Sequence, residues 1–91
     1  MSKLIARAKV LPVDVNIKPE VLLERIRNSI HVGSIKRYSV EPIAFGLNAL
    51  LIDFIIEDAE GGTEALEDSL KETEGVSQVD IIGVSRASAT I

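Results

Sequence analysis

The chain is poor in the residues that usually carry metal chemistry. It contains one histidine, His31, and no cysteine, whereas a zinc site needs several nitrogen or sulfur ligands at workable spacing. His31 falls just after a predicted helix, where we expect it to interact with the terminal carbonyl groups. Asp58, Glu60 and Glu64 could gather around a hard cation, but their spacing lacks the regular positions and fixed glycine of a calcium loop. We interpret this segment as a solvated acidic loop and expect no metal site.

Patterns for nucleophilic catalysis and for phosphate binding are equally weak. Ser39, Ser77 and Ser85 have no sequence context that suggests an adjacent base to activate a hydroxyl group. Gly61-Gly62 precedes a predicted helix, whose N-terminus attracts anions, but the acidic residues around the pair would repel a phosphate group. We interpret the two glycines as a tight turn. The sequence therefore predicts a protein that is not an enzyme and carries no cofactor.

The most informative stretch is the apolar turn Glu41-Pro42-Ile43-Ala44-Phe45-Gly46-Leu47. A hairpin tip normally carries polar residues, whereas this one places an aromatic side chain between a proline and a glycine. Phe45 could fold back onto the core or stand exposed, and its sequence context leaves both open. If it is exposed, a rigid aromatic at a braced tip is suited to anchor a protein partner. Burial of the ring would then contribute about 2 kcal/mol.

Six elements are predicted around this turn. Alternation of apolar residues predicts strands over residues 3–11, 34–40, 47–56 and 76–84. The poor alternation of the second strand suggests a bulge. A helix is predicted between Pro19 and Gly33, capped by Asp14 or Asn16, and a second helix begins at the cap Thr63.

This order, β-α-β-β-α-β, predicts an α+β fold, the ferredoxin-like split β-α-β sandwich. Two right-handed crossovers joined by a hairpin give a four-stranded antiparallel sheet in the order 4-1-3-2, with both helices on one face. The open face should then bring Arg7 and Lys9 near Asp53. Such an exposed pair is worth at most about 1 kcal/mol.

Length and charge limit the classes of function. The 91 residues predict a single domain over 1–91, with residues 87–91 as a frayed tail. The net charge is −4, yet residues 1–45 hold eight of the ten basic residues. Residues 46–91 hold ten of the fourteen acidic residues. The surface is therefore either ordinarily solvated or bipolar enough to orient a protein partner.

Nucleic acid and membrane are not the expected partners. The predicted open face lacks the aromatic residues that stack RNA bases, although a weak phosphate-binding patch stays open for Arg7, Lys9, Lys36 and Arg37. No apolar run is long enough to span a bilayer, and the first residues lack a signal-peptide pattern. We expect a cytoplasmic protein.

Several segments carry a resemblance to a known family. They are Glu41 to Leu50 (EPIAFGLNAL), Glu57 to Ala65 (EDAEGGTEA), Glu74-Gly75-Val76 and the opening Ala8 to Pro12. Together, in order along nearly the whole chain, they resemble archaeal translation elongation factor 1-beta. They are also similar to the C-terminal exchange domain of the eukaryotic factor.

The resemblance implies guanine nucleotide exchange on elongation factor 1-alpha, the GTPase that delivers aminoacyl-tRNA. In that family the domain binds the GTPase and disturbs its Mg²⁺ and phosphate region, so that GDP leaves and GTP enters. Phe45 matches the family's hairpin phenylalanine, so we expect partner contacts at the tip, by Pro42, Ile43, Phe45 and Gly46. Arg86 aligns at or next to a penultimate lysine that is directed toward the Mg²⁺ site in the eukaryotic domain. Arginine is planar and bulkier than lysine, and this chain runs five residues further.

Two other classes of protein stay open on the same fold. A ligand-sensing module would have a pocket at a dimer interface and would be stabilised by a small metabolite. An RNA-binding module would show strong, salt-dependent affinity for RNA.

Overall fold

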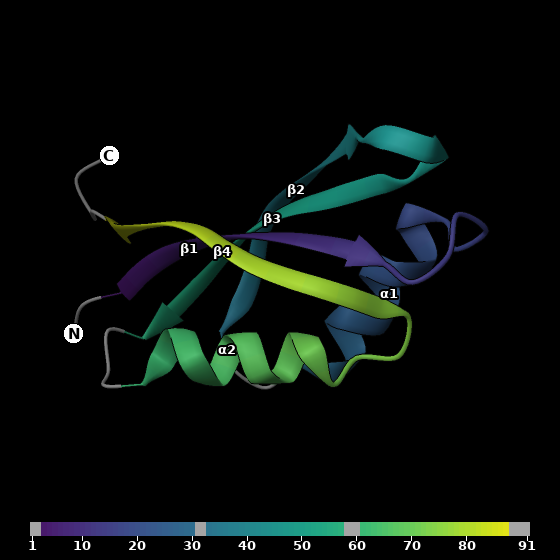
Figure 1. Cartoon of the computed structure of the whole chain (residues 1–91). Helices are drawn as coiled ribbons and strands as arrows, with labels where there is room; N and C mark the ends of the chain where they lie inside the picture. The colour runs from purple at the N-terminus through teal and green to yellow at the C-terminus, as the bar shows by residue number, and fades with distance from the viewer. Residues whose placement is uncertain (1–2, 31–32, 58–60, 88–91) are drawn as a thin grey trace.

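The order of helices and strands in the computed structural model follows the predicted pattern (Figure 1). The structure describes residues 3–30, 33–57 and 61–87, apart from the side chain of Ala87. The elements are β1 (Lys3–Pro12), α1 (Pro19–Ser29), β2 (Ser34–Pro42), the 3₁₀ turn η1 (Ala44–Gly46), β3 (Asn48–Glu57), α2 (Gly62–Lys71) and β4 (Val76–Ala87).

The four strands form one antiparallel sheet in the order β2-β3-β1-β4. This is the predicted order 4-1-3-2 read from the other edge, so the ferredoxin-like α+β fold is confirmed. Both helices cover one face of the sheet (Figure 1). The helix α2 packs mainly against β4, whereas α1 lies against β3 and β2. Among the residues that the structure describes, no helix lies on the opposite face of the sheet.

The two central strands, β1 and β3, build the core between sheet and helices. They pair from Lys3↔Glu57 to Val10↔Leu50 without a shift of register. Small residues of β1 face large ones of β3, because Ala6 pairs with Phe54 and Ala8 with Ile52. The fully buried apolar side chains of the two strands all lie on the helix side, apart from Ala49 at the start of β3: Ala6, Ala8, Val10, Ala49, Leu50, Ile52, Phe54 and Ile56. The helices complete the core with Leu22, Leu23, Ile26, Leu66 and Leu70.

Both helix N-termini differ from the predicted caps. The N-cap of α1 is Lys18, which makes no side-chain cap hydrogen bond, and Pro19 follows in the first turn. The Asp14 carboxylate instead accepts a hydrogen bond from the N–H of Asn16 at 2.8 Å, which stabilises the preceding loop. The N-cap of α2 is Gly61 with φ 77°, and Thr63 lies inside the helix. The predicted caps were therefore wrong for both helices. Asp14 bonds within the loop before α1, and a left-handed Gly61 begins α2 in place of Thr63.

Each edge strand contains an irregularity in its pairing. In β2 the register shifts between Ile35 and Arg37, which confirms the predicted bulge. In β4 it shifts where Ala8 pairs with Ile81 and Arg7 pairs with Gly83. β4 also continues to Ala87, beyond the predicted end at residue 84, so Arg86 lies within a strand. The remaining residues of the expected tail, 88–91, lie outside the described part of the chain.

The close contact made by Gly33 gives a first testable prediction. Gly33 has φ +76°, and a Cβ there would collide with the carbonyl oxygen of Ile55 and lie 2.8 Å from Cγ2 of Ile56. Gly61 has φ +77° but no atom within 4 Å of an added Cβ. We expect Gly33→Ala to lower the free energy of unfolding by more than about 3 kcal/mol and Gly61→Ala by about 1 kcal/mol. Urea unfolding measures both values, and equal losses would show that backbone strain alone explains Gly33.

Candidate partner-binding site

The tip of the β2–β3 hairpin is closed by backbone hydrogen bonds. The Ile43 N–H donates to the carbonyl oxygen of Leu47 at 2.8 Å, and the Leu47 N–H donates to that of Ala44 at 3.3 Å. Pro42 ends β2 and pairs with Asn48 at the start of β3. These contacts fix the three residues of η1 as a short turn instead of an open loop.

Phe45 is the most exposed large apolar residue among those that the structure describes. Its side chain is 93% exposed, so of the two alternatives left by the sequence the structure has the exposed one. Its backbone is left-handed, with φ 63° and ψ 30°, a conformation that costs a residue with a Cβ roughly 1–2 kcal/mol. Gly46 follows with φ 77°, where glycine pays no such cost. The tip therefore holds an aromatic ring in water at a cost in strain, with no packing gain within the chain.

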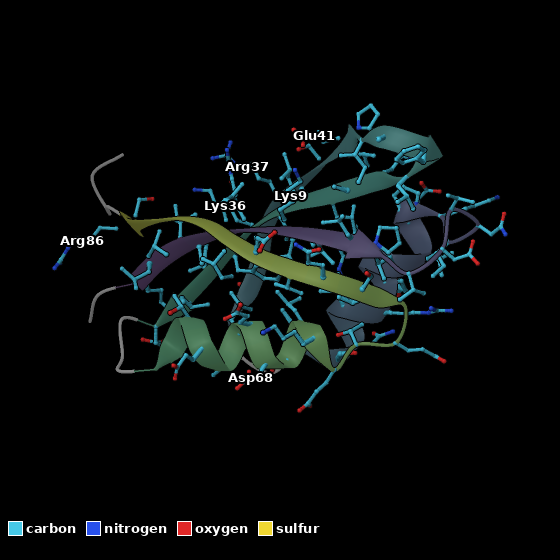
Figure 2. All side chains as sticks on the ribbon, viewed as in Figure 1. Lys9, Lys36, Arg37, Glu41, Asp68 and Arg86 are labelled. Carbon is cyan, nitrogen blue, oxygen red and sulfur yellow. The ribbon has the colours of Figure 1, made fainter. Side chains whose placement is uncertain are left out.

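The hairpin tip and Arg86 lie at opposite ends of the sheet. Arg86 pairs with Leu4 at one end of β1, whereas the strands of the hairpin reach the other end, where Leu50 pairs with Val10. At about 3.4 Å per residue along the strands, the two sites are about 30 Å apart. In Figure 2, Arg86 lies near the C-terminal end of β4, away from Glu41, which lies toward the hairpin tip. The structure therefore groups Pro42, Ile43, Phe45 and Gly46, and places Arg86 apart from them.

The side chain of Arg86 projects from the end of β4 into solvent (Figure 2). It is exposed, and no ion pair joins it to another residue within the described ranges. It is therefore available to an external anion or to the charges of a partner.

An ionic cluster on the open face of the sheet was only partly predicted. Asp53 bonds Arg7 as expected, with Arg7 Nε 2.8 Å from Oδ1 and Nη2 3.2 Å from Oδ2. The prediction of an exposed pair was wrong for Asp53, which is only 4% exposed. Arg37, whose bond to Asp53 was not predicted from the sequence, donates from Nε to Oδ2 at 3.0 Å. Lys9 pairs instead with Glu41 at 3.4 Å, because its partner in register on β3 is Leu51. The signal for Arg37 was hidden by the bulge in β2, which changes the face to which later residues point.

This cluster changes the titration of its buried carboxylate. Hydrogen bonds from Arg7 hold the pKa of Asp53 below its ordinary value; burial opposes this shift, and the charges of both arginines and a hydrogen bond from Arg37 add to it. The same bond to Asp53 raises the pKa of Arg7. Two of the four residues of the suggested phosphate-binding patch are thus engaged with Asp53, and a third, Lys9, with Glu41.

Other candidate sites gain no support from the described residues. No group of three or more His, Cys, Asp or Glu side chains in them could hold a metal ion. His31, Asp58 and Glu60 lie outside the described part of the chain. Within it, neither helix is long and apolar enough to cross a membrane.

Comparison with known proteins identifies clear relatives. Residues 5–87 match the sequence profile described as the EF-1 guanine nucleotide exchange domain. The chain is 51% identical over 88 residues to elongation factor 1-beta of Staphylothermus marinus, covering 94% of this chain and 98% of that protein. It is 46% identical over 88 residues to elongation factor 1-beta of Aeropyrum pernix, and the match covers 94% of this chain and 98% of that protein. It is also 43% identical over 90 residues to elongation factor 1-beta of Thermofilum pendens, and the match covers 97% of this chain and 99% of that protein.

The buried carboxylate of Asp53 gives a prediction about stability and pH. We expect Asp53→Asn to lower the free energy of unfolding by about 2 kcal/mol at neutral pH, because two half-exposed arginines lose their charged acceptor. The folded pKa lies below the unfolded value near 3.8, so the carboxylate stabilises the fold above that value. Its contribution is lost as the pH falls through the folded pKa. The difference between wild type and variant should therefore shrink below about pH 4.

Chemical denaturation across this pH range measures the difference. The matched control is Glu57→Gln, which removes the exposed pair with Lys3 and should cost less than about 0.5 kcal/mol. If Asp53→Asn lowers the free energy of unfolding no more than the control does, or by the same amount at every pH, the Asp53 carboxylate does not stabilise the fold as we infer.

Proposed function

The chain belongs to the family of the EF-1 guanine nucleotide exchange domain, and from this membership we propose that it promotes exchange of GDP for GTP on elongation factor 1-alpha. It would act as a translation factor in the cytoplasm, with residues 1–91 as a single exchange domain. It would bind the GTPase and disturb the region that holds Mg²⁺ and phosphate. No covalent bond is made or broken by the chain itself.

The exposed ring of Phe45 is the observation that carries this proposal. A side chain that is 93% exposed on a strained backbone gains nothing from the fold that holds it. Burial against a partner would recover about 2 kcal/mol from the ring alone. The closed backbone of the tip also limits the entropy lost on binding, because the ring is already held on a short turn.

Arg86 is proposed as the second contact, at the other end of the sheet. Its guanidinium keeps a positive charge at neutral pH and can compete with a cation near phosphate groups. A separation of about 30 Å from Phe45 allows one domain to touch two parts of a GTPase at once. Paired strands of one sheet join the two sites, so binding energy gained at the tip would help to hold the charge of Arg86 at its target.

Exchange requires differential binding to two states of the GTPase. The factor must hold the nucleotide-free state more tightly than the GDP-bound state, and by linkage GDP and factor then weaken each other's binding. Tight binding to both states equally would release no nucleotide.

The direct test is release of fluorescent GDP from loaded elongation factor 1-alpha. With Mg²⁺ and excess GTP present, we expect the chain to accelerate release at substoichiometric amounts. Absence of acceleration would overturn the proposal. If a ligand-sensing module is the true function, the chain would instead be stabilised by a small metabolite, and an RNA-binding module would bind RNA with strong salt dependence.

The aromatic anchor gives a prediction on exchange rate. We expect Phe45→Ala to lower the rate at subsaturating factor by about 30-fold, the equivalent of 2 kcal/mol of lost burial. Its free energy of unfolding should not fall, because the ring packs on nothing in the free chain. The control Val13→Ala removes another apolar side chain, 62% exposed, and should leave the rate unchanged. Equal rates for Phe45→Ala and wild type would exclude the ring as a contact.

The cation at the end of β4 gives a separate prediction. We expect Arg86→Ala to lower the exchange rate by about tenfold and Arg86→Lys to restore most of it, because the charge is retained. A chain ending at Ala87 should remain active, and Arg27→Ala on α1 serves as the control for loss of an exposed arginine. If the chain ending at Ala87 loses exchange activity and Arg86→Ala does not, Arg86 is not the positive charge that acts on the GTPase.

A further inference from the structure

A hollow opens on the helix-free face of the sheet beside the ionic cluster. It has a volume of about 410 Å³ and is lined by Ile5, Arg7, Arg37, Asp53, Ile82, Gly83, Val84 and Ser85. Four of these residues stand in one row across the four strands, because Gly83 pairs with Arg7, Arg7 with Asp53, and Asp53 with Arg37. The row ends at Gly83 of β4, an edge strand of the sheet, and Gly83 adds no side chain to it.

Gly83 is not explained by backbone strain or by crowding. Its φ lies outside the left-handed range, and a Cβ built on it meets no atom within 4 Å. Any small residue would fit this position in the free chain. Because Gly83 has no side chain, the position next to Arg7 on β4 is empty. A ligand can therefore reach the Arg7 guanidinium from the side of β4.

The two arginines keep hydrogen-bonding capacity that Asp53 does not use. Each guanidinium has five N–H donors, and only three bonds from the pair reach the carboxylate. The other donors find no protein acceptor in the part of the chain that the structure describes. Their side chains are 53% and 66% exposed, whereas that of Asp53 is 5% exposed and lies beneath them. The hollow is lined by two arginines and one carboxylate, so an anion that enters it meets a net positive charge and free N–H groups.

We propose that this hollow is a binding site for an acidic side chain, aspartate or glutamate, presented by a segment of a partner protein. Guanidinium groups bind carboxylates through paired, charge-assisted hydrogen bonds. Ile5, Ile82 and Val84 add apolar walls that suit the aliphatic neighbours of such a side chain, and Ile82 and Val84 are half exposed. A polyanionic nucleic acid fits less well, because the chain carries a net charge of −4 and the lining has no aromatic side chain for stacking. The site lies apart from the hairpin tip and does not depend on nucleotide exchange.

The test follows the ¹⁵N-labelled chain by nuclear magnetic resonance. The probes are the blocked peptides Val-Glu-Val and Val-Gln-Val, inorganic phosphate and a short oligouridine. We expect saturable shifts of the Gly83 and Ser85 amides and of the Nε–H signals of Arg7 and Arg37 with Val-Glu-Val. Val-Gln-Val should bind at least about tenfold more weakly.

Two variants and a control locate the binding. Gly83→Val fills the hollow and leaves the ion pairs in place, so it should weaken Val-Glu-Val binding by at least about tenfold. Arg37→Gln removes donors without filling the hollow and should also weaken it. Ser77→Val adds an apolar side chain to an exposed position of β4 outside the hollow and should bind like wild type. Equal binding of the two peptides, unchanged binding by both hollow variants, or tighter binding of phosphate or oligouridine would overturn the proposal.

Discussion

The pairing of β1 with β3 is the interaction on which the rest of the structure depends. Eight consecutive pairs join the two strands without a shift, and the helix side of this ladder forms the centre of the core. A slip by one residue would turn every buried side chain of β1 to the open face. The same register brings Arg7 opposite Asp53, so one constraint sets both the apolar layer and the ionic cluster above it.

The positions proposed to contact a partner lie where this central pairing ends. The hairpin tip extends beyond Val10 and Leu50, and Arg86 lies beside Leu4 at the other end. Because the paired strands between them are continuous, the distance between the two proposed contacts is set by the sheet and not by a linker. Phe45 lowers the stability of the fold, because its backbone is left-handed and its ring is exposed to water. Packing elsewhere in the core compensates for this loss.

Much of the fold could be predicted from the sequence because alternation is strong in the two central strands. Ala6, Ala8 and Val10 alternate with charged or half-buried residues, and Leu50 to Ile56 alternate around Asp53, so both faces could be assigned. The edge strands carry bulges, and alternation cannot be followed across an extra residue. For this reason the bond from Arg37 to Asp53 could not be predicted.

The candidate site was predictable in composition but not in geometry. An apolar tip braced by Pro42 and Gly46 stands out in the sequence, yet local patterns do not say toward which side of a hairpin a ring will turn.

The central claim is that the chain promotes nucleotide exchange on elongation factor 1-alpha. The most direct measurement of this claim is the affinity of the chain for the GTPase in its nucleotide-free and GDP-bound states. Titration calorimetry should give binding to the nucleotide-free GTPase at least about tenfold tighter than to the GDP-bound form. Equal affinity for the two forms would contradict the account.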